Sequence, residues 1–296
     1  NAKLGPGYLV SMDLFWQWFV LSPQLGGGGD GILVFNHPGR EDALHSVLLQ
    51  IGEGVGQATR MAGALNALNV FQQGDPAYAF NDFKYVAPAD YRVVGLEVFG
   101  KGDEYDTDGK FGSWYGHALD KGWYVGPAGS EDHHETNWGG ANLPKTVVIA
   151  RANNQADIRE AFLARRFYTV AQNENALRMN FEAIQGNQRL PMGSRIGTQD
   201  NTVQFEVGIR STQAMDPLQD MSFELFSSQS GPGSNDEQRY LPLQTETGKN
   251  GRFTVSPADG KNWYFVRVKR GDRIVAVSAP IWIFKGSEPL PECKPL

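Results

Sequence analysis

The chain has 296 residues, of which 41% are hydrophobic and 11% aromatic, and its formal net charge is −6. It contains no apolar run of about 18 residues, so the sequence predicts no membrane-spanning helix. Its single cysteine, Cys293, excludes an internal disulfide and a thiolate-rich zinc site, so any metal site must use His, Asp and Glu.

The charge is distributed unevenly along the chain. Residues 1–174 hold 13 Lys and Arg against 20 Asp and Glu, whereas residues 175–296 hold 14 against 13. A nucleic-acid groove needs a positive surface, so the acidic first part predicts no nucleic-acid partner. That part is compatible with a carboxylate-lined cation site, and equally with ordinary solubilising charge.

Predicted strands and helices alternate in the first part of the chain. Apolar runs bounded by turn residues predict buried strands at 31–35, 93–99, 124–125 and 146–150. Helices are predicted at 41–70, at 113–121 and from the capping residue Asn154 to Arg166. This alternation favours an α/β domain with a parallel sheet over residues 1–174.

The pattern changes after about residue 175. Apolar residues alternate with polar ones in segments 203–209, 221–225 and 264–268, and clusters of turn-forming residues separate these segments. Strands with a period of two and no helical signal predict an all-β part, which we interpret as a β-sandwich of the immunoglobulin-like kind over residues 175–296.

Histidine and acidic side chains lie at several predicted strand ends. His37 follows the first strand, Glu97 lies near the end of the second, and Asp132 and His134 form an Asp-x-His pair beyond the third. Ligands gather at the carboxyl ends of strands in α/β folds, so these four residues are candidate site residues. A carboxylate and an imidazole two positions apart suit Zn, Mn, Fe or Ni, although the Asp-x-His pair alone also fits a polar loop.

Six segments together carry a family resemblance through their order and spacing: 34–40, 95–99, 118–123, 129–134, 164–168 and 192–194. From about residue 30 to its end, the chain resembles the polymerase-and-histidinol-phosphatase (PHP) superfamily, in the branch of carbaryl-hydrolase-like enzymes. The resemblance implies a distorted (β/α)7 barrel with a metal cluster in its mouth, followed by the sandwich. It implies a metal-dependent hydrolase of phosphoesters or of related esters such as carbamates, and a periplasmic or secreted location.

The resemblance also implies roles for individual residues. His37, Glu97, Asp132 and His134 are the implied ligands of divalent Zn, Mn or Fe ions. Asp132 would also orient or deprotonate a metal-activated water, and Arg166 would stabilise the negative charge of an ester or phosphoester substrate.

The chain departs from the family pattern at its beginning. Residues 1–36 contain neither the opening His-x-His pair of the family nor the acid and histidine that follow it. We therefore expect a partial barrel whose first strands are absent from this chain. The alternative, from a different class, is a non-catalytic binding or surface protein in which the sandwich does the binding and the α/β part is a relic.

Overall fold

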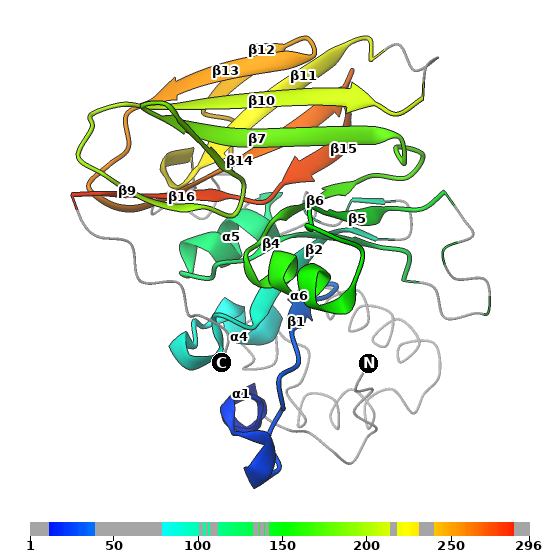
Figure 1. Cartoon of the computed structure of the whole chain (residues 1–296), viewed down its shortest axis with the longest axis vertical. Helices are drawn as coiled ribbons and strands as arrows, with labels where there is room; N and C mark the ends of the chain where they lie inside the picture. The colour runs from blue at the N-terminus through cyan, green and yellow to red at the C-terminus, as the bar shows by residue number, and fades with distance from the viewer. Residues whose placement is uncertain are drawn as a thin grey trace, which may run out of the picture.

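The computed structural model describes residues 12–38, 79–100, 103–104, 106, 112–132, 136, 139, 142–213, 218–230 and 240–286. Strand is the main element within these ranges, and three sheets form. Figure 1 shows two sheets stacked in the upper half of the view, with the smaller parallel sheet and the helices below them. No helix in these ranges has both the length and the apolar character needed to cross a bilayer.

The helices are short, and α5 and α6 each begin at a capping residue. The α-helices are α1 Met12–Val20, α4 Ala79–Phe83, α5 Trp114–Asp120 and α6 Gln155–Leu163, and the 3-10 turns are η1 Pro23–Leu25, η2 Ala87–Ala89 and η4 Ser228–Ser230. Ser113 and Asn154 accept hydrogen bonds from the first-turn amides of α5 and α6. The helix predicted at 41–70 lies outside the described residues.

The smallest sheet consists of β1 Leu33–Phe35, β2 Val93–Gly100, β3 Asp103–Glu104 and β4 Gly126–Ser130. β1 and β4 both pair with β2 in parallel, and β3 pairs with it antiparallel. Every residue of β2 is buried, as expected for a continuous apolar run in a parallel sheet. Because β1 and β4 run in the same direction, the segments that follow them leave the sheet at the same edge.

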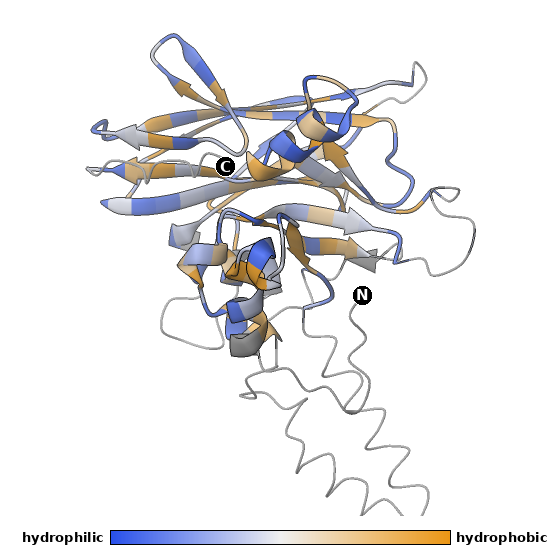
Figure 2. Cartoon of the chain, turned by 60° about the horizontal axis from the view of Figure 1, so that its bottom comes forward, coloured by the Kyte–Doolittle hydropathy of each residue, from blue (hydrophilic) through white to orange (hydrophobic). Residues whose placement is uncertain are grey.

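The other two sheets face each other. The larger contains β5 Lys145–Val148, β6 Phe167–Val170, β9 Arg195–Thr198, β11 Met221–Ser227, β12 Gln244–Thr247, β14 Gly260–Arg270, β15 Arg273–Ser278 and β16 Ile281–Lys285. The four-stranded sheet has the order β13-β10-β7-β8, from β13 Asn250–Val255, β10 Val203–Ser211, β7 Leu177–Gln185 and β8 Gln188–Pro191. Hydrophilic and hydrophobic residues alternate along these strands in Figure 2.

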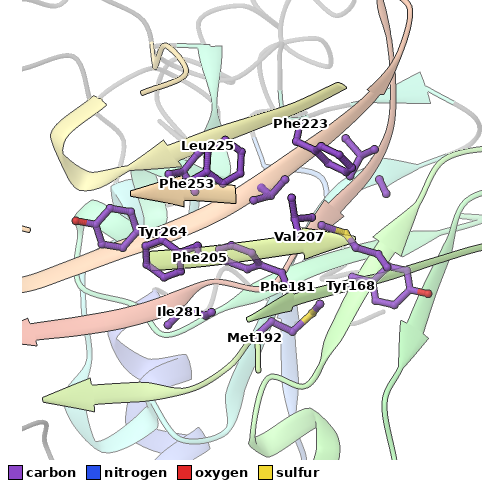
Figure 3. Close-up of a cluster of buried hydrophobic side chains, with 14 of the residues drawn as sticks. Tyr168, Phe181, Met192, Phe205, Val207, Phe223, Leu225, Phe253, Tyr264 and Ile281 are labelled. Atoms are coloured by element: carbon purple, nitrogen blue, oxygen red, sulfur yellow. The ribbon is translucent and has the colours of Figure 1, made fainter. Parts of the chain in front are cut away.

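The central strands of the eight-stranded sheet are buried on both faces, as the residues of β14 illustrate. Tyr264 and Val266 belong to the core between the two facing sheets, which Figure 3 shows with Phe181 and Phe205. The alternate residues Trp263 and Phe265 belong to a second core shared with the helices and the parallel sheet. The sheet therefore forms the middle layer of the molecule.

The parallel sheet packs very closely on this middle layer at β4. A Cβ atom on Gly126 would collide with the ring of Phe167, and one on Gly129 would collide with the side chain of Thr169. Glycine is therefore required at both positions by the close approach of β4 to β6.

The predicted fold class is wrong. No (β/α)7 barrel, complete or partial, is formed by the described part of the chain. β5 and β6 flank helix α6 but pair antiparallel with each other, and β6 pairs antiparallel with β15. β5 and β6 thus belong to the eight-stranded sheet. The prediction failed here because a strand–helix–strand pattern in the sequence does not determine which strand becomes the neighbour.

The division predicted between residues 174 and 175 stays a prediction. Strand β6 lies before this boundary and strand β15 lies after it. The two strands pair, so the two parts of the chain share one sheet.

Candidate functional site

Three of the predicted ligands lie together at the edge of the parallel sheet. His37 follows β1, Glu97 lies in β2, and Asp132 follows β4. Nδ1 of His37 lies 2.5 Å from Oε2 of Glu97, and Nε2 lies 3.3 Å from Oδ1 of Asp132. With Ser130, whose hydroxyl donates to Oε1 of Glu97, these residues form what we call the strand-end cluster.

The strand-end cluster is held tightly. The Glu97 side chain is fully buried, and the backbone amide of His37 donates to its Oε2 at 2.8 Å. His37 and Asp132 have φ angles of 52° and 44°, in the left-handed region that residues other than glycine seldom adopt. Such backbone strain persists only where the surrounding structure enforces it, so the fold actively brings these side chains together.

The strand-end cluster is not arranged as a metal centre. Each ring nitrogen of His37 lies near one carboxylate oxygen, Nδ1 near Glu97 and Nε2 near Asp132. No group of three or more His, Cys, Asp and Glu side chains among the described residues is arranged to hold a metal ion. His134, the fourth predicted ligand, lies outside those residues. The expected PHP metal centre is therefore wrong for the described part of the chain, whereas the individual roles of His37, Glu97, Asp132 and His134 as ligands stay predictions.

Arg166, the predicted substrate anchor, is engaged elsewhere. Its guanidinium pairs with both carboxylate oxygens of Glu160 on α6, and its Nε donates to the carbonyl of Ile149 at 3.4 Å. The hydrogen bond from Arg166 lowers the pKa of Glu160. These contacts are with α6 and the end of β5, not with the strand-end cluster.

The strand-end cluster is expected to contribute to stability. His37→Ala would leave the fully buried Glu97 carboxylate without its basic partner, so we expect the free energy of unfolding to fall by about 3 kcal/mol. Urea unfolding measures this. Adding Glu97→Gln to His37→Ala should recover part of the loss, because the unpaired charge is removed. Equal stability of wild type and His37→Ala would contradict this role.

A second feature lies on the outer face of the four-stranded sheet. Arg178 of β7 is the direct cross-strand partner of Arg210 of β10, while their neighbours Met179 and Ile209 belong to the sandwich core. Like charges directly opposite each other are destabilising. Neither guanidinium forms an ion pair with a carboxylate of the described residues; Arg178 donates to the carbonyls of Asn175 and Leu177.

An acidic pair on the same two strands provides an internal comparison. Glu182 of β7 lies opposite Glu206 of β10, four residues along each strand from the arginine pair. Nη1 of Arg189 lies 3.0 Å from Glu182 and 2.7 Å from Glu206, and Arg252 lies 2.5 Å from Glu206. Arg189 and Arg252 both lower the pKa of Glu206. The acidic pair is therefore neutralised, and the arginine pair is not.

The arginine pair lines a groove of about 680 Å³. Tyr168 also lines it, and Figure 3 shows its hydroxyl directed away from the other labelled core side chains. That hydroxyl donates to the carbonyl of Leu177 at 3.3 Å, and burial raises its pKa. An adjoining hollow of about 310 Å³ shares three lining residues with the groove: Asn180, Gly208 and Asn250. We call the groove and hollow together the trough.

The sequence contained only part of the signal for this surface. Arg210 directly follows the predicted strand at 203–209, whereas Arg178 lies in no predicted strand. Cross-strand register is a tertiary property, so the pairing of the two residues is not visible in one sequence.

Comparisons with known proteins do not assign the chain. No family model matches it, and no curated protein matches it. Solved structures with some similarity include an AA10 lytic polysaccharide monooxygenase from Streptomyces lividans, with 14% identity over 34% of this chain and 63% of that chain and a TM-score of 0.19. A DUF3823 family protein from Bacteroides ovatus has 12% identity over 40% of this chain and 74% of that chain, with a TM-score of 0.21. An endo-beta-1,4-mannanase from Thermotoga petrophila has 12% identity over 64% of this chain and 39% of that chain, with a TM-score of 0.24. The chain thus spans less than two thirds of the monooxygenase. TM-scores this low do not establish a shared fold. None of the comparisons supports the expected PHP assignment or places the chain in a family.

Proposed function

We propose that this chain is a non-catalytic ligand-binding protein whose sandwich holds an anionic ligand through Arg178 and Arg210. One observation carries the proposal: the arginine pair lacks a described carboxylate partner, while the glutamate pair on the same strands is neutralised by two arginines. An anion placed between the two guanidinium groups would remove their repulsion and accept several hydrogen bonds at once.

The expected affinity for a simple anion is modest. Arg178 is half-buried and Arg210 is exposed, so solvent screens the attraction. A dissociation constant on the order of 1 mM is reasonable for inorganic phosphate at such a site. A phosphoester, the substrate class expected from the sequence, carries the same kind of group and stays among the ligands to be tested.

The periplasmic or secreted location expected from the sequence stays a prediction. Its basis was the PHP resemblance, so the present proposal does not depend on it. Hydrolysis is not part of the proposal.

Thermal unfolding in phosphate, compared with chloride at equal ionic strength, tests the arginine pair. A ligand at ten times its dissociation constant stabilises the folded state by about 1.4 kcal/mol. We expect wild type to show a phosphate-dependent rise in Tm that Arg178→Gln/Arg210→Gln lacks. In chloride alone, the double variant should be slightly more stable than wild type, because the repulsion is relieved.

A matched control separates site binding from general salt effects. Phosphate also stabilises proteins by exclusion from their surface, so the difference between variants is the readout. Arg189→Gln/Arg252→Gln removes the same charge from the same sheet but leaves the arginine pair, and it should keep the wild-type phosphate shift. Equal shifts in wild type and Arg178→Gln/Arg210→Gln would overturn the proposal.

A further inference from the structure

We propose that the amine of Lys261 is a modification site that takes up carbon dioxide reversibly, forming a carbamate whose charge offsets that of Arg195. The amine nitrogen forms a bond to the carbon of carbon dioxide, an electron pair of one C=O bond moves to its oxygen, and the amine gives a proton to water. The site is separate from the arginine pair of the proposed function. Lys261 lies on the face of β14 that carries Trp263 and Phe265, and the opposite face packs on the four-stranded sheet.

Tyr124 and Gly122 fix the position of the amine. Nζ of Lys261 lies 3.6 Å from the centre of the Tyr124 ring and donates to the carbonyl of Gly122 at 2.8 Å. The guanidinium carbon of Arg195 lies 3.7 Å from the centre of the same ring. A ring face attracts cations but has no net charge, and burial raises the pKa of Tyr124, so the phenol stays neutral. Two cations therefore share one aromatic ring that cannot balance their charge.

Positive charge outnumbers negative charge around Lys261. Burial raises the pKa of Asp90, and Arg165, Arg195 and Lys261 all oppose that rise. Asp90 is the one carboxylate of the described residues that acts on Lys261. Tyr85 adds no charge, because burial and Asp90 raise its pKa. Three cations beside one carboxylate leave an excess of positive charge, which is unfavourable in a partly buried cluster.

Carbamate formation removes this excess. It replaces the positive charge of Lys261 by a negative one, so that two cations and two anions remain. The carbamate nitrogen keeps one N–H, which can still donate to the carbonyl of Gly122. Attraction between the carbamate and Arg195 replaces the repulsion between two cations, and this change is larger in a partly buried site than in water.

The amine of Lys261 is also activated as a nucleophile. Burial lowers the pKa of Lys261 to about 8, Asp90 opposes this effect and Arg195 adds to it. At about pH 7.5, roughly a quarter of such an amine is neutral, against about 0.1% of an ordinary lysine. Only the neutral amine has a lone pair to attack carbon dioxide. Carbon dioxide is small and uncharged, so it can reach this partly buried amine without a large pocket.

Chemical trapping of the carbamate tests this inference on the full chain. The protein is equilibrated with isotope-labelled bicarbonate at about pH 7.5 and treated with triethyloxonium, which converts a carbamate to a stable ester that peptide mass spectrometry locates. Lys261 should carry at least about tenfold more label than the exposed Lys249. Arg195→Gln should lower the label at Lys261 at least about fivefold, because the pKa of the amine rises and the carbamate loses a nearby cation. Arg189→Gln removes the same charge from the four-stranded sheet and should keep the wild-type label.

Each result has a defined meaning. Label at Lys261 no higher than at Lys249 would overturn the inference, and this measurement on wild type needs no variant to fold. Equal label in wild type and Arg195→Gln would also overturn it, because the charge of Arg195 would then have no role. If bicarbonate raises the Tm of wild type and Lys261→Arg equally and no label is trapped, the cluster binds an anion and forms no carbamate. The phosphate test of Arg178 and Arg210 does not depend on any of these results.

Discussion

Arg165→Met should lower the free energy of unfolding by about 4 kcal/mol or more, a loss large enough to reduce Tm by on the order of 10 °C. Only 4% of Arg165 is exposed, and its guanidinium donates hydrogen bonds to backbone carbonyls from several segments. The acceptors are the carbonyl oxygens of Tyr124 at 2.6 Å, Asp90 at 2.7 Å, Val93 at 3.1 Å and Tyr91 at 3.2 Å, together with that of Leu163.

The size of this loss of stability follows from the backbone carbonyls that Arg165→Met would leave without a hydrogen-bond donor. Methionine fills a similar volume but donates no hydrogen bond, so buried carbonyls would lose their partner at a cost of about 1–3 kcal/mol for each one that water cannot reach. Arg165 also lowers the pKa of Asp90, which burial raises, so its removal would further disfavour the Asp90 carboxylate.

The neighbouring arginine offers the control. Arg166→Met removes only a partly exposed pair with Glu160, which should cost less than about 1 kcal/mol. Chemical unfolding of both variants measures the two losses. Similar losses for Arg165→Met and Arg166→Met would show that the carbonyl contacts of Arg165 contribute little.

Arg267→Met should also destabilise the protein strongly, by about 3–5 kcal/mol at neutral pH. Nη2 of Arg267 on β14 lies 3.2 Å from Oδ2 of Asp106, which is only 1% exposed. Ser113 and the amide of Tyr115, at the start of α5, also donate to this carboxylate. The pair therefore joins α5 to the eight-stranded sheet, and removal of Arg267 leaves a buried charge without its cation.

The pH dependence of this effect has a definite sign. Burial raises the pKa of Asp106, and Arg267 opposes that rise. The pKa of Asp106 in the folded protein therefore lies above its unfolded value, and stability falls as pH rises from the unfolded pKa through the folded one. Without Arg267 the folded pKa of Asp106 is higher still, so the stability difference between wild type and Arg267→Met should shrink as the pH falls from neutral through the folded pKa values of Asp106.

Urea unfolding across this pH range checks the expectation. Asp106→Asn/Arg267→Met removes both charges and should be more stable than Arg267→Met at neutral pH, with a pH dependence that no longer contains this titration. A constant difference between wild type and Arg267→Met at all pH values would show that the loss comes from packing rather than from the Asp106 charge.

Local features of the chain were readable without a structure. The caps Ser113 and Asn154 begin helices, and the continuous apolar run at 93–99 lies in the fully buried strand β2. The sequence also placed His37, Glu97 and Asp132 at strand ends, and their side chains do lie together in the structure. Capping, apolar runs and strand-end placement are expressed within a few residues, which is why sequence alone determined them.

Strand partners, by contrast, were decided only by the tertiary structure. β6 pairs with β15, more than a hundred residues later, so the expected barrel is replaced by a sheet buried on both faces. The tertiary structure also decides that Arg178 lies opposite Arg210. It likewise decides that Arg165, and not Arg166, is the buried arginine. Register, direction of pairing and burial depend on contacts between segments far apart in the chain, and a single sequence does not encode these in any local pattern.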